Sequence, residues 1–576
     1  MSLLERIEAS GEEDGLEPGK RLIKAGDGRG FSLTERLAYR IHRLSWRTPF
    51  HSLRLRGRFP LKLLLVPKDP VAGGREAGEA ILSGRIVHGG AGVAIKELNF
   101  AGADLAPGLS DHVQSFAWLR DLAAAAPRER GSETAEMLVR RWLAQCGGQV
   151  SERAWRADLW GRRILFWTAY APYILSSRDL VYRSAVLNAL ARGSRHIDRG
   201  ADRAPPGLKR VTAWAGVIAS ALVIQGGPAR LSKGETGLIR ALAEALHEDG
   251  GLVSRAPFEQ LALVETLGQL RAVYYAARRE APEEMADALF RAVSALLSVT
   301  LGDGALGNWQ GGNMLARHAV DAAVEGSALE VRALREARGW GYQRLAARKT
   351  QIVIDAAPPP PTRALLGGCA STLAFEMSDG SDRLIVNCGG GEALGPELAR
   401  ALRTTAAHST LTLGDRNSTA IHDDGTLGKG VSEVELSRDD VGGAGRLEAS
   451  HDGYARRFGF VHRRRLMLSA DGAELQGEDV LEPRGRKRRS PGLAFTLRFH
   501  LGPAVEVTST ADGQGALLRI KGGATWQFRC RDAALTSEES LWIDGSARPH
   551  ATRQLVVSGE AAADGSTISW SFKRAG

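Results

Sequence analysis

The sequence predicts an α + β protein of more than one domain, with a helical domain followed by an antiparallel β-sandwich. Between about residues 111 and 340, apolar residues recur every three or four positions, which is typical of amphipathic helices. After Trp340, short alternating runs take over, and Asp-Gly turns separate them. Many short strands with regular turn signals are typical of an all-β sandwich. We therefore place a domain boundary near residue 340.

Each domain can be divided into expected elements. The helical pattern predicts helices near 163–176, 179–193, 207–225, 235–247, 257–278 and 283–300. The alternating pattern predicts strands near 350–354, 371–377, 383–386, 411–413, 463–468, 493–500, 517–520, 525–529, 554–557 and 568–572. The resulting domain limits are 1–30 (a disordered N-terminus rich in Gly, Glu and Asp), 31–110 (a basic segment with a short helix and strands), 111–340 and 341–576.

Composition limits the classes of partner. The chain has 576 residues and a formal net charge of +10, which favours attraction to polyanions. It carries no nucleic-acid-binding signature, so we expect no nucleic acid as a partner. The four cysteines form no CxxC pair, which favours reduced core thiols. No apolar run approaches ~18 residues, and the N-terminus has no apolar signal core, so we expect a cytoplasmic protein.

Residues 36–66 are both basic and apolar. Their sequence, RLAYRIHRLSWRTPFHSLRLRGRFPLKLLLV, is compatible with a basic amphipathic helix that docks on a membrane surface. The alternative is a helix packed on the main domain, followed by a short strand before Pro67. The sequence leaves both readings open.

A second stretch, residues 402–415, draws attention to one histidine. It reads LRTTAAHSTLTLGD, in which His408 precedes an alternating Thr/Leu strand. Histidine titrates near neutrality and can move protons or stabilise a developing charge. A hydrogen-bonded structural histidine is the alternative.

This stretch resembles the histidine-strand motif of the bacterial heparinase II/III-like proteins. Five further strings resemble the same family in the same order, namely SFAWLRDL (115–122), APYILSSRDLVYRSAVLNAL (171–190), GYQRLAARKTQIVIDAAPPPP (341–361), ASHDGYARRFGFVHRRRL (449–466) and LRFHLGP (497–503). The resemblance implies that the helices form an incomplete (α/α) toroid, a ring of helix pairs with a groove across one end.

The resemblance also implies a reaction, the cleavage of acidic polysaccharide by β-elimination. In the family's lyases, an Asn or His neutralises the uronate carboxylate, a Tyr acts as base or acid, and a His from the β domain assists. His408 matches the third role. The segment expected to hold the Asn or His reads APPGLKR (204–210), and Phe258 stands where the Tyr is expected. A phenyl ring cannot exchange a proton, so the enzymatic activity stays an open question.

Other residues are candidates for the missing roles. Tyr275 lies on the same predicted helix as Phe258, about four to five turns away, and Asn188 could line the groove; we take these with His408 as the catalytic candidates. The candidates for substrate binding are Arg192, His196, Arg255, Asn308, Trp309 and Arg403. For each of them an ordinary packed or solvated side chain is the alternative.

The sequence predicts no cofactor. Asp415, His422, Asp423, His451 and Asp452 are close in sequence, but their spacing fits no standard metal motif, so a structural Zn or Ca in the β domain is only a secondary hypothesis.

Two functions from different classes remain. The first is a heparinase II/III-like lyase acting on an acidic, uronate-containing glycan. The alternative is a non-catalytic glycan-binding or envelope-associated protein that kept the fold and lost the catalytic Tyr and Asn. In either case an acidic polysaccharide or other polyanionic glycan is the expected partner. The family's lyases are periplasmic or secreted, so the resemblance implies a periplasmic location as the alternative to the cytoplasm.

Overall fold

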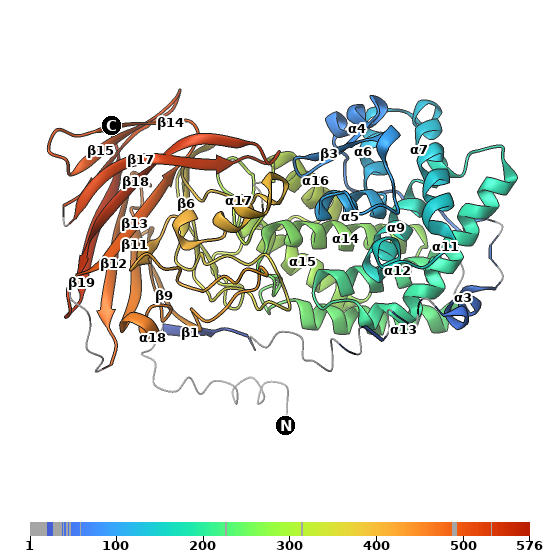
Figure 1. Cartoon of the computed structure of the whole chain (residues 1–576), viewed down its shortest axis with the longest axis horizontal. Helices are drawn as coiled ribbons and strands as arrows, with labels where there is room; N and C mark the ends of the chain where they lie inside the picture. Colours follow the sequence, from blue (N-terminus) through green and yellow to red (C-terminus); the bar gives the residue numbers. More distant parts are fainter. Residues whose placement is uncertain are drawn as a thin grey trace.

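The computed structural model places a helical domain beside a β domain (Figure 1). It describes residues 20–26, 37, 40–41, 44, 46, 48–57, 59–60, 62–224, 227–312, 315–485, 492–531 and 533–575. Helix α16 ends at Ser327 and strand β4 begins at Tyr342, on either side of the boundary that the sequence predicts near residue 340. No helix among the described residues is long and apolar enough to cross a membrane.

The helical domain is built from pairs of antiparallel helices. Its main helices are α5 (Pro107–Ser115), α6 (Trp118–Ala125), α7 (Arg128–Trp142), α9 (Ala157–Ala169), α11 (Leu180–Gly200), α12 (Leu208–Val223), α13 (Gly227–Ala245), α14 (Pro257–Ala276), α15 (Glu283–Ser298) and α16 (Arg317–Ser327). Helices α9, α12 and α14 contact one another, α13 packs against α12, and α15 packs against α14 and α13. This arrangement confirms the predicted toroid of helix pairs.

Buried tryptophans fill the space between these helices. The fully buried examples in this domain include Trp118, Trp142, Trp155, Trp160 and Trp167. Large aromatic side chains bury much apolar area per residue, so they stabilise a wide helical ring. Glycines permit the close approach of α9 and α12, because a Cβ on Gly161 would lie 2.2 Å from the Thr212 carbonyl oxygen.

The β domain is an antiparallel sandwich of two large sheets, which confirms the predicted architecture. One sheet has the order β1-β9-β10-β11-β12-β19-β16-β15-β14, and the other has the order β17-β18-β13-β7-β6-β5-β4, with β8 (Leu411–Leu413) paired to β13. The strands of the first sheet are β1 (Lys20–Lys24), β9 (Glu433–Val441), β10 (Ala444–His451), β11 (Phe460–Leu468), β12 (Glu474–Pro483), β14 (Val505–Ser509), β15 (Gly515–Ile520), β16 (Thr525–Cys530) and β19 (Ser566–Arg574). Those of the second are β4 (Tyr342–Ala347), β5 (Thr350–Asp355), β6 (Phe375–Asp379), β7 (Asp382–Val386), β13 (Leu493–Leu501), β17 (Ala534–Ile543) and β18 (Pro549–Ala561). Apolar side chains from both sheets form one buried cluster.

Strand β1 corrects the expectation of a disordered N-terminus for part of its length. Lys20–Lys24 pairs with β9 along five residues, so this part of the segment is ordered by an open sheet edge. Ile23 also packs against the sandwich core. Residues 1–19 and 27–30 of the same prediction lie outside the described residues.

The segment before the toroid forms a small bridge to the β domain. It contains helix α4 (Arg75–Leu82) and a hairpin of β2 (Arg85–His88) and β3 (Ala91–Ala94). At the hairpin turn, Gly90 has a φ of +79°, and a Cβ there would lie 2.4 Å from the Cβ of Ala547. Only glycine fits this position, because it satisfies both the left-handed backbone and the close contact with the β17–β18 turn.

Candidate functional site

His408 lies at the mouth of β8 and is almost completely buried, with 2% of its surface exposed. Its Nδ1 atom is 2.7 Å from the carbonyl oxygen of Thr404. A carbonyl can only accept, so Nδ1 carries the proton and Nε2 is the acceptor of a neutral imidazole. Burial lowers the pKa of His408, which keeps this ring neutral at physiological pH. The ring can accept one proton at Nε2, but it cannot act as an acid in this state.

Arg255 joins the two domains. It precedes α14 with a φ of +54°, and its Nη2 atom is 2.6 Å from Oδ1 of Asp355 at the end of β5. Its Nε and Nη1 atoms donate to the carbonyl oxygens of Trp340 and Pro358, both at 2.8 Å. Both charged side chains are buried. Arg255, predicted as a carboxylate-binding residue, therefore already has a protein carboxylate as its partner.

Asn308 and Trp309 lie at the same domain junction. The backbone N–H of Asn308 donates to Oε1 of the buried Glu376 at 3.2 Å, and its side-chain amide donates to the Asn387 carbonyl at 3.4 Å. The Trp309 ring packs against Tyr342 with 5.4 Å between ring centroids. Both side chains are buried, at 2% and 1% exposure. In this arrangement neither offers an exposed surface for a sugar.

Phe258 and Tyr275 occupy opposite ends of α14. A Cβ on Gly312 would lie 2.5 Å from the Phe258 ring, so the phenyl group packs on the loop before α16. Tyr275 is 86% exposed in the last turn of α14. At 1.5 Å per residue, the 17 residues between them span about 25 Å. Tyr275 therefore does not lie beside Phe258, and the structure does not bring it to the junction where Asp355 and His408 meet.

The candidates on α11 make contacts within the helical domain. The guanidinium of Arg192 donates to the carbonyl oxygens of Gly147 and Gly148, and His196 contacts the Trp155 carbonyl at 2.7 Å through Nε2. Asn188 is half-buried on the same helix. These contacts join α11 to neighbouring parts of the helical domain. The three side chains therefore do not belong to the junction between the two domains.

Arg403 also binds carbonyl oxygens, those of Gly368 at 2.7 Å, Gly425 at 2.9 Å and Leu366 at 3.2 Å. Arg403 thereby connects the loop that contains Leu366 and Gly368 with the loop that contains Gly425. The predicted binding role of Arg403 has no further support from its geometry, because its Nε and Nη2 atoms donate to backbone carbonyl oxygens.

The acidic and histidine residues considered for a metal are dispersed. Asp423 pairs with Arg400 at 2.5 Å, Asp452 accepts from the Ser432 N–H at 2.8 Å, and His451 is bonded to His462. Across the described ranges, no group of three or more His, Cys, Asp or Glu side chains is placed to hold a metal ion.

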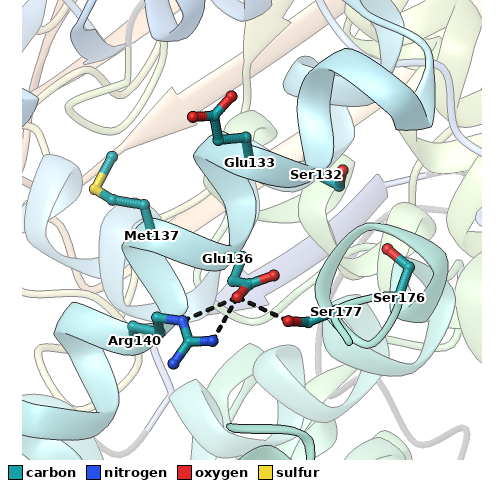
Figure 2. Close-up of a pocket in the computed structure, with 7 residues that line it drawn as sticks. All are labelled: Ser132, Glu133, Glu136, Met137, Arg140, Ser176 and Ser177. Carbon is teal, nitrogen blue, oxygen red and sulfur yellow. Dashed lines mark hydrogen bonds and ion pairs between the residues drawn. The ribbon is translucent and has the colours of Figure 1, made fainter. Parts of the chain in front are cut away.

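A surface groove of about 510 Å³ lies elsewhere, between α7 and the turn before α11 (Figure 2). Its lining is mostly polar, and Glu136 accepts from Ser177 at 2.9 Å and from Arg140. The helices that form it lie at the side of the helical domain away from the sandwich (Figure 1). This groove is therefore separate from His408.

The sequence reasoning missed a polar cluster inside the helical ring. Asp69 accepts from Arg120 Nε at 2.9 Å, from the Tyr170 hydroxyl at 3.1 Å and from Gln269 at 3.3 Å, and Arg120 also pairs with Glu265 at 3.1 Å. These residues are up to 200 positions apart in sequence. Local spacing could not reveal them; the only signal was a polar residue inside each apolar helical pattern.

Comparisons with known proteins identify relatives that share this sequence or this fold. The model of the heparinase II/III-like C-terminal domain matches residues 330–571. FtsZ-localized protein C of Caulobacter vibrioides is 30% identical over 561 residues, covering 91% of this chain and 92% of that protein. Among solved structures, heparinase III superposes with a TM-score of 0.66 at 11% identity, covering 96% of this chain and 92% of that one. The heparan sulfate lyase of Pedobacter heparinus superposes with a TM-score of 0.57 at 13% identity, covering 94% and 88%.

The similarity to the two lyases extends over nearly the whole chain and concerns the fold, since the identities are low. The sequence similarity to the Caulobacter protein is also nearly full-length, and the family model covers the sandwich that carries His408. Helical toroid, sandwich and histidine strand occur together in this order. The chain belongs to the heparinase II/III-like family.

Proposed function

We propose that this chain is a non-catalytic, envelope-associated binding protein that docks on an anionic membrane surface through residues 37–66. The observation that carries the proposal is a set of exposed apolar side chains in this segment. Leu37, Ile41 and Leu44 are 59%, 58% and 60% exposed, and the described residues around them are helical. Their spacing of four and three places them on one helical face. An apolar face turned to solvent favours an interfacial helix.

The apolar surface continues along the chain. In α3 (Pro49–Leu55), Phe50 is 74% and Leu53 60% exposed, and after it Leu64 and Val66 are 59% and 50% exposed. Among the described residues of this segment, the exposed basic side chains are Arg40, Arg54, Arg56 and Lys62. A basic residue near an anionic leaflet contributes about 1 kcal/mol. The combination of charge and apolar surface therefore fits an anionic bilayer.

The opposite side of this segment is fixed to the helical domain. Trp46 and Leu55 are buried, His51 Nε2 is 3.2 Å from His196 Nδ1, and Arg195 donates to the Leu55 carbonyl at 3.0 Å. Helix α3 lies at the end of the molecule away from the sandwich (Figure 1). The exposed face would therefore present the β domain away from the membrane.

A non-catalytic role is supported by the chemistry at the junction. β-Elimination requires a base for the C5 proton and an acid for the leaving oxygen. His408 offers one neutral acceptor, Phe258 has no proton to exchange, and Tyr275 lies at the far end of α14. The fold of the solved lyases favours lyase activity as the second candidate. Lyase activity would need a second ionisable group beside His408.

The name of the Caulobacter relative records localisation with FtsZ. We propose that this chain works at the same place, on the cytoplasmic face of the membrane where FtsZ assembles. Coincidence of a fluorescent fusion with FtsZ rings would support this location. A uniform or periplasmic distribution would contradict it.

Vesicle co-sedimentation tests the docking surface. We expect the protein to bind vesicles of phosphatidylglycerol and phosphatidylcholine, and to bind more weakly in high salt. Phe50→Glu with Leu53→Glu should weaken binding by about tenfold or more, because two buried apolar contacts are replaced by charges that the surface repels. The matched control is Leu180→Glu with Val181→Glu, since these side chains are 69% and 81% exposed on α11. Equal binding by both variants, or no binding by the wild type, would refute the proposal.

A turnover assay separates the two candidate functions. Uronate-containing polysaccharides are incubated with the protein, and the absorbance of a new double bond conjugated to the carboxylate is followed. We expect no signal. A signal that His408→Ala abolishes would establish lyase activity and would leave the docking proposal to the vesicle experiment.

A further inference from the structure

Three side chains where the β2–β3 hairpin meets the helical domain form what we call the imidazole–guanidinium cluster: His88 on β2, His112 on α5 and Arg162 on α9. The two imidazole rings stack, with centroids 4.2 Å apart and planes 9° from parallel. His112 is buried and His88 is exposed, so the stack leads from the surface into the domain. Arg162 is half-buried. The cluster shares no residue with the junction around His408 or with residues 37–66.

Arg162 differs from its neighbour Arg120 in one respect. Both guanidinium groups flank the Phe166 ring, at 5.9 Å and 5.2 Å from its centroid. The charge of Arg120 is balanced by Asp69 at 2.9 Å and Glu265 at 3.1 Å. Within the described part of the chain, Arg162 has neither a hydrogen bond nor an ion pair. A partly buried cation beside another cation is unfavourable unless an anion accompanies it.

His112 supplies a second unsatisfied group. The side chain is 8% exposed, and its Nε2 atom is buried without a hydrogen-bond partner. The nearest carboxylate oxygen, Oδ2 of Asp121, is 4.0 Å away, which is too far for a hydrogen bond. Buried polar atoms in native proteins nearly always have a partner, so an orphan calls for an explanation.

Several charged groups surround the two imidazole rings. Desolvation by the surrounding protein and the charge of Arg162 lower the pKa values of both His88 and His112, so the rings are neutral in the absence of a ligand. The other charged groups that face them are Arg120, Asp121 and Glu265. Glu265 pairs with Arg120, which also pairs with Asp69, and burial raises the pKa of Asp121 to about 6. Glu265, Asp111 and Asp158 attract the charge of Arg162, but among the described residues none of them hydrogen-bonds to its guanidinium, so its N–H donors are available to a ligand.

We infer that the imidazole–guanidinium cluster binds an oxyanion, such as the phosphate group of a larger ligand, with Arg162 as the two-pronged donor and the imidazoles as additional donors. A guanidinium fork matches two oxygens of such a group. The anion would offset the charge of Arg162 and allow His112 to take up a proton. Protonated His112 would then attract both the anion and Asp121. Binding of the anion is therefore coupled to proton uptake.

The first test is the melting temperature with and without inorganic phosphate. We expect phosphate to stabilise the wild type, because a ligand that binds the folded state raises its melting temperature. Arg162→Gln should weaken phosphate binding by about tenfold or more. Without phosphate this variant should be as stable as the wild type or more stable, because the guanidinium makes no hydrogen bond or ion pair among the described residues that would be lost. The matched control, Arg317→Gln, removes an exposed arginine that pairs with Asp321 at 3.0 Å.

Three results would overturn the inference: equal phosphate stabilisation of wild type and Arg162→Gln, no stabilisation of the wild type by phosphate, sulfate or acetate, or a lower melting temperature of Arg162→Gln in the absence of anions. The last would show that the guanidinium serves the fold itself. Sulfate and acetate distinguish tetrahedral from planar oxyanions. Calorimetry in two buffers of different ionisation enthalpy measures the proton uptake, and His112→Gln should reduce it while retaining part of the binding.

Discussion

Two histidine clusters, one in the sandwich and one between the β2–β3 hairpin and the helical domain, differ in how completely their hydrogen bonds are satisfied. In the sandwich, His451 Nδ1 accepts from the Gly453 N–H at 3.1 Å, so its Nε2 carries the proton and donates to His462 Nδ1 at 3.2 Å. His462 Nε2 in turn donates to Asp479 at 2.7 Å. The direction of each bond follows from the one before it. Every ring nitrogen of His451 and His462 therefore has a hydrogen-bond partner.

Further donors complete the sandwich cluster. Arg464 Nε donates to Asp479 Oδ1 and Trp570 Nε1 donates to its Oδ2, both at 2.8 Å. The imidazole–guanidinium cluster has the same kinds of group, yet His112 Nε2 and Arg162 lack partners among the described residues. A saturated network stabilises one structure, whereas an unsaturated one retains the capacity to bind a ligand. We therefore assign the first to stability and the second to recognition.

The largest expected effect is the acid dependence of stability. Burial lowers the pKa of five buried histidines, His112, His408, His451, His462 and His500, the last to about 3. At pH values below the unfolded histidine pKa of about 6.5, the unfolded chain binds more protons than the folded one. The free energy of unfolding therefore decreases as the pH is lowered. Each histidine contributes up to about 1.4 kcal/mol per pH unit. Melting temperatures between pH 7.5 and 5 should therefore drop steeply; a flat profile would contradict this.

Asp121 contributes to the pH dependence of stability with the opposite sign to the histidines. Its folded pKa of about 6 lies above the unfolded value, so between pH 6 and 4 the folded state binds a proton that the unfolded chain releases. This offsets part of the loss due to the histidines. Asp121→Asn should remove the offset and steepen the acid profile. The measurement is the same melting series, and a shallower profile in the variant would count against the raised pKa.

Asp479→Ala should be the most damaging single substitution in the sandwich. It leaves the buried cation of Arg464 without its counter-charge and orphans donors on His462 and Trp570, at a cost of about 3–5 kcal/mol in the free energy of unfolding. Urea unfolding followed by tryptophan fluorescence measures it. Asp202→Ala is the control, since Asp202 forms an exposed pair with Arg240 whose loss costs less than about 1 kcal/mol. Similar costs for both would contradict the assignment.

Arg255→Ala should have a comparable or smaller effect, about 3 kcal/mol, because it leaves Asp355 buried with fewer partners. Asp355 retains hydrogen bonds from Ser371 Oγ at 2.6 Å and from Gln310 Nε2 at 3.4 Å, which limits the cost. The variant should also loosen the two domains, so limited proteolysis between α16 and β4 should accelerate. If the variant were less stable but its proteolysis rate were unchanged, the loss of stability would arise within one domain and not from the contact between the domains.

Sequence patterns predicted the elements whose burial alternates or repeats regularly. The strands near 493–500 and 568–572 were found because their apolar residues alternate, and they are β13 and β19. Strands β9 and β12 were missed because both faces carry charges. On the sheet these charges pair across strands, as Arg463 does with Glu482 at 2.8 Å and Arg465 with Glu478 at 2.7 Å. Cross-strand pairing is not visible in a local window.

The site was less predictable than the fold. Motif similarity located His408 and the substitution at Phe258, because both lie in short local strings. It could not show that Arg255 is paired with Asp355, 100 residues away, or that the last turn of α14 turns Tyr275 to solvent. Long-range partners decide whether a polar residue is structural or free to bind, and a single sequence does not contain them.

The smallest expected effect concerns Tyr275. Its side chain is 86% exposed, so Tyr275→Ala should change the free energy of unfolding by less than about 0.5 kcal/mol. Tyr274, one residue earlier, is 1% exposed and its hydroxyl donates to Glu235 at 2.9 Å, so Tyr274→Ala should cost about 3 kcal/mol or more. Because the two variants change the same residue type on one helical turn, the difference between them measures the effect of side-chain burial. If Tyr275→Ala instead abolished glycan turnover without affecting stability, the exposed end of α14 would be a reaction site and the non-catalytic assignment would be wrong.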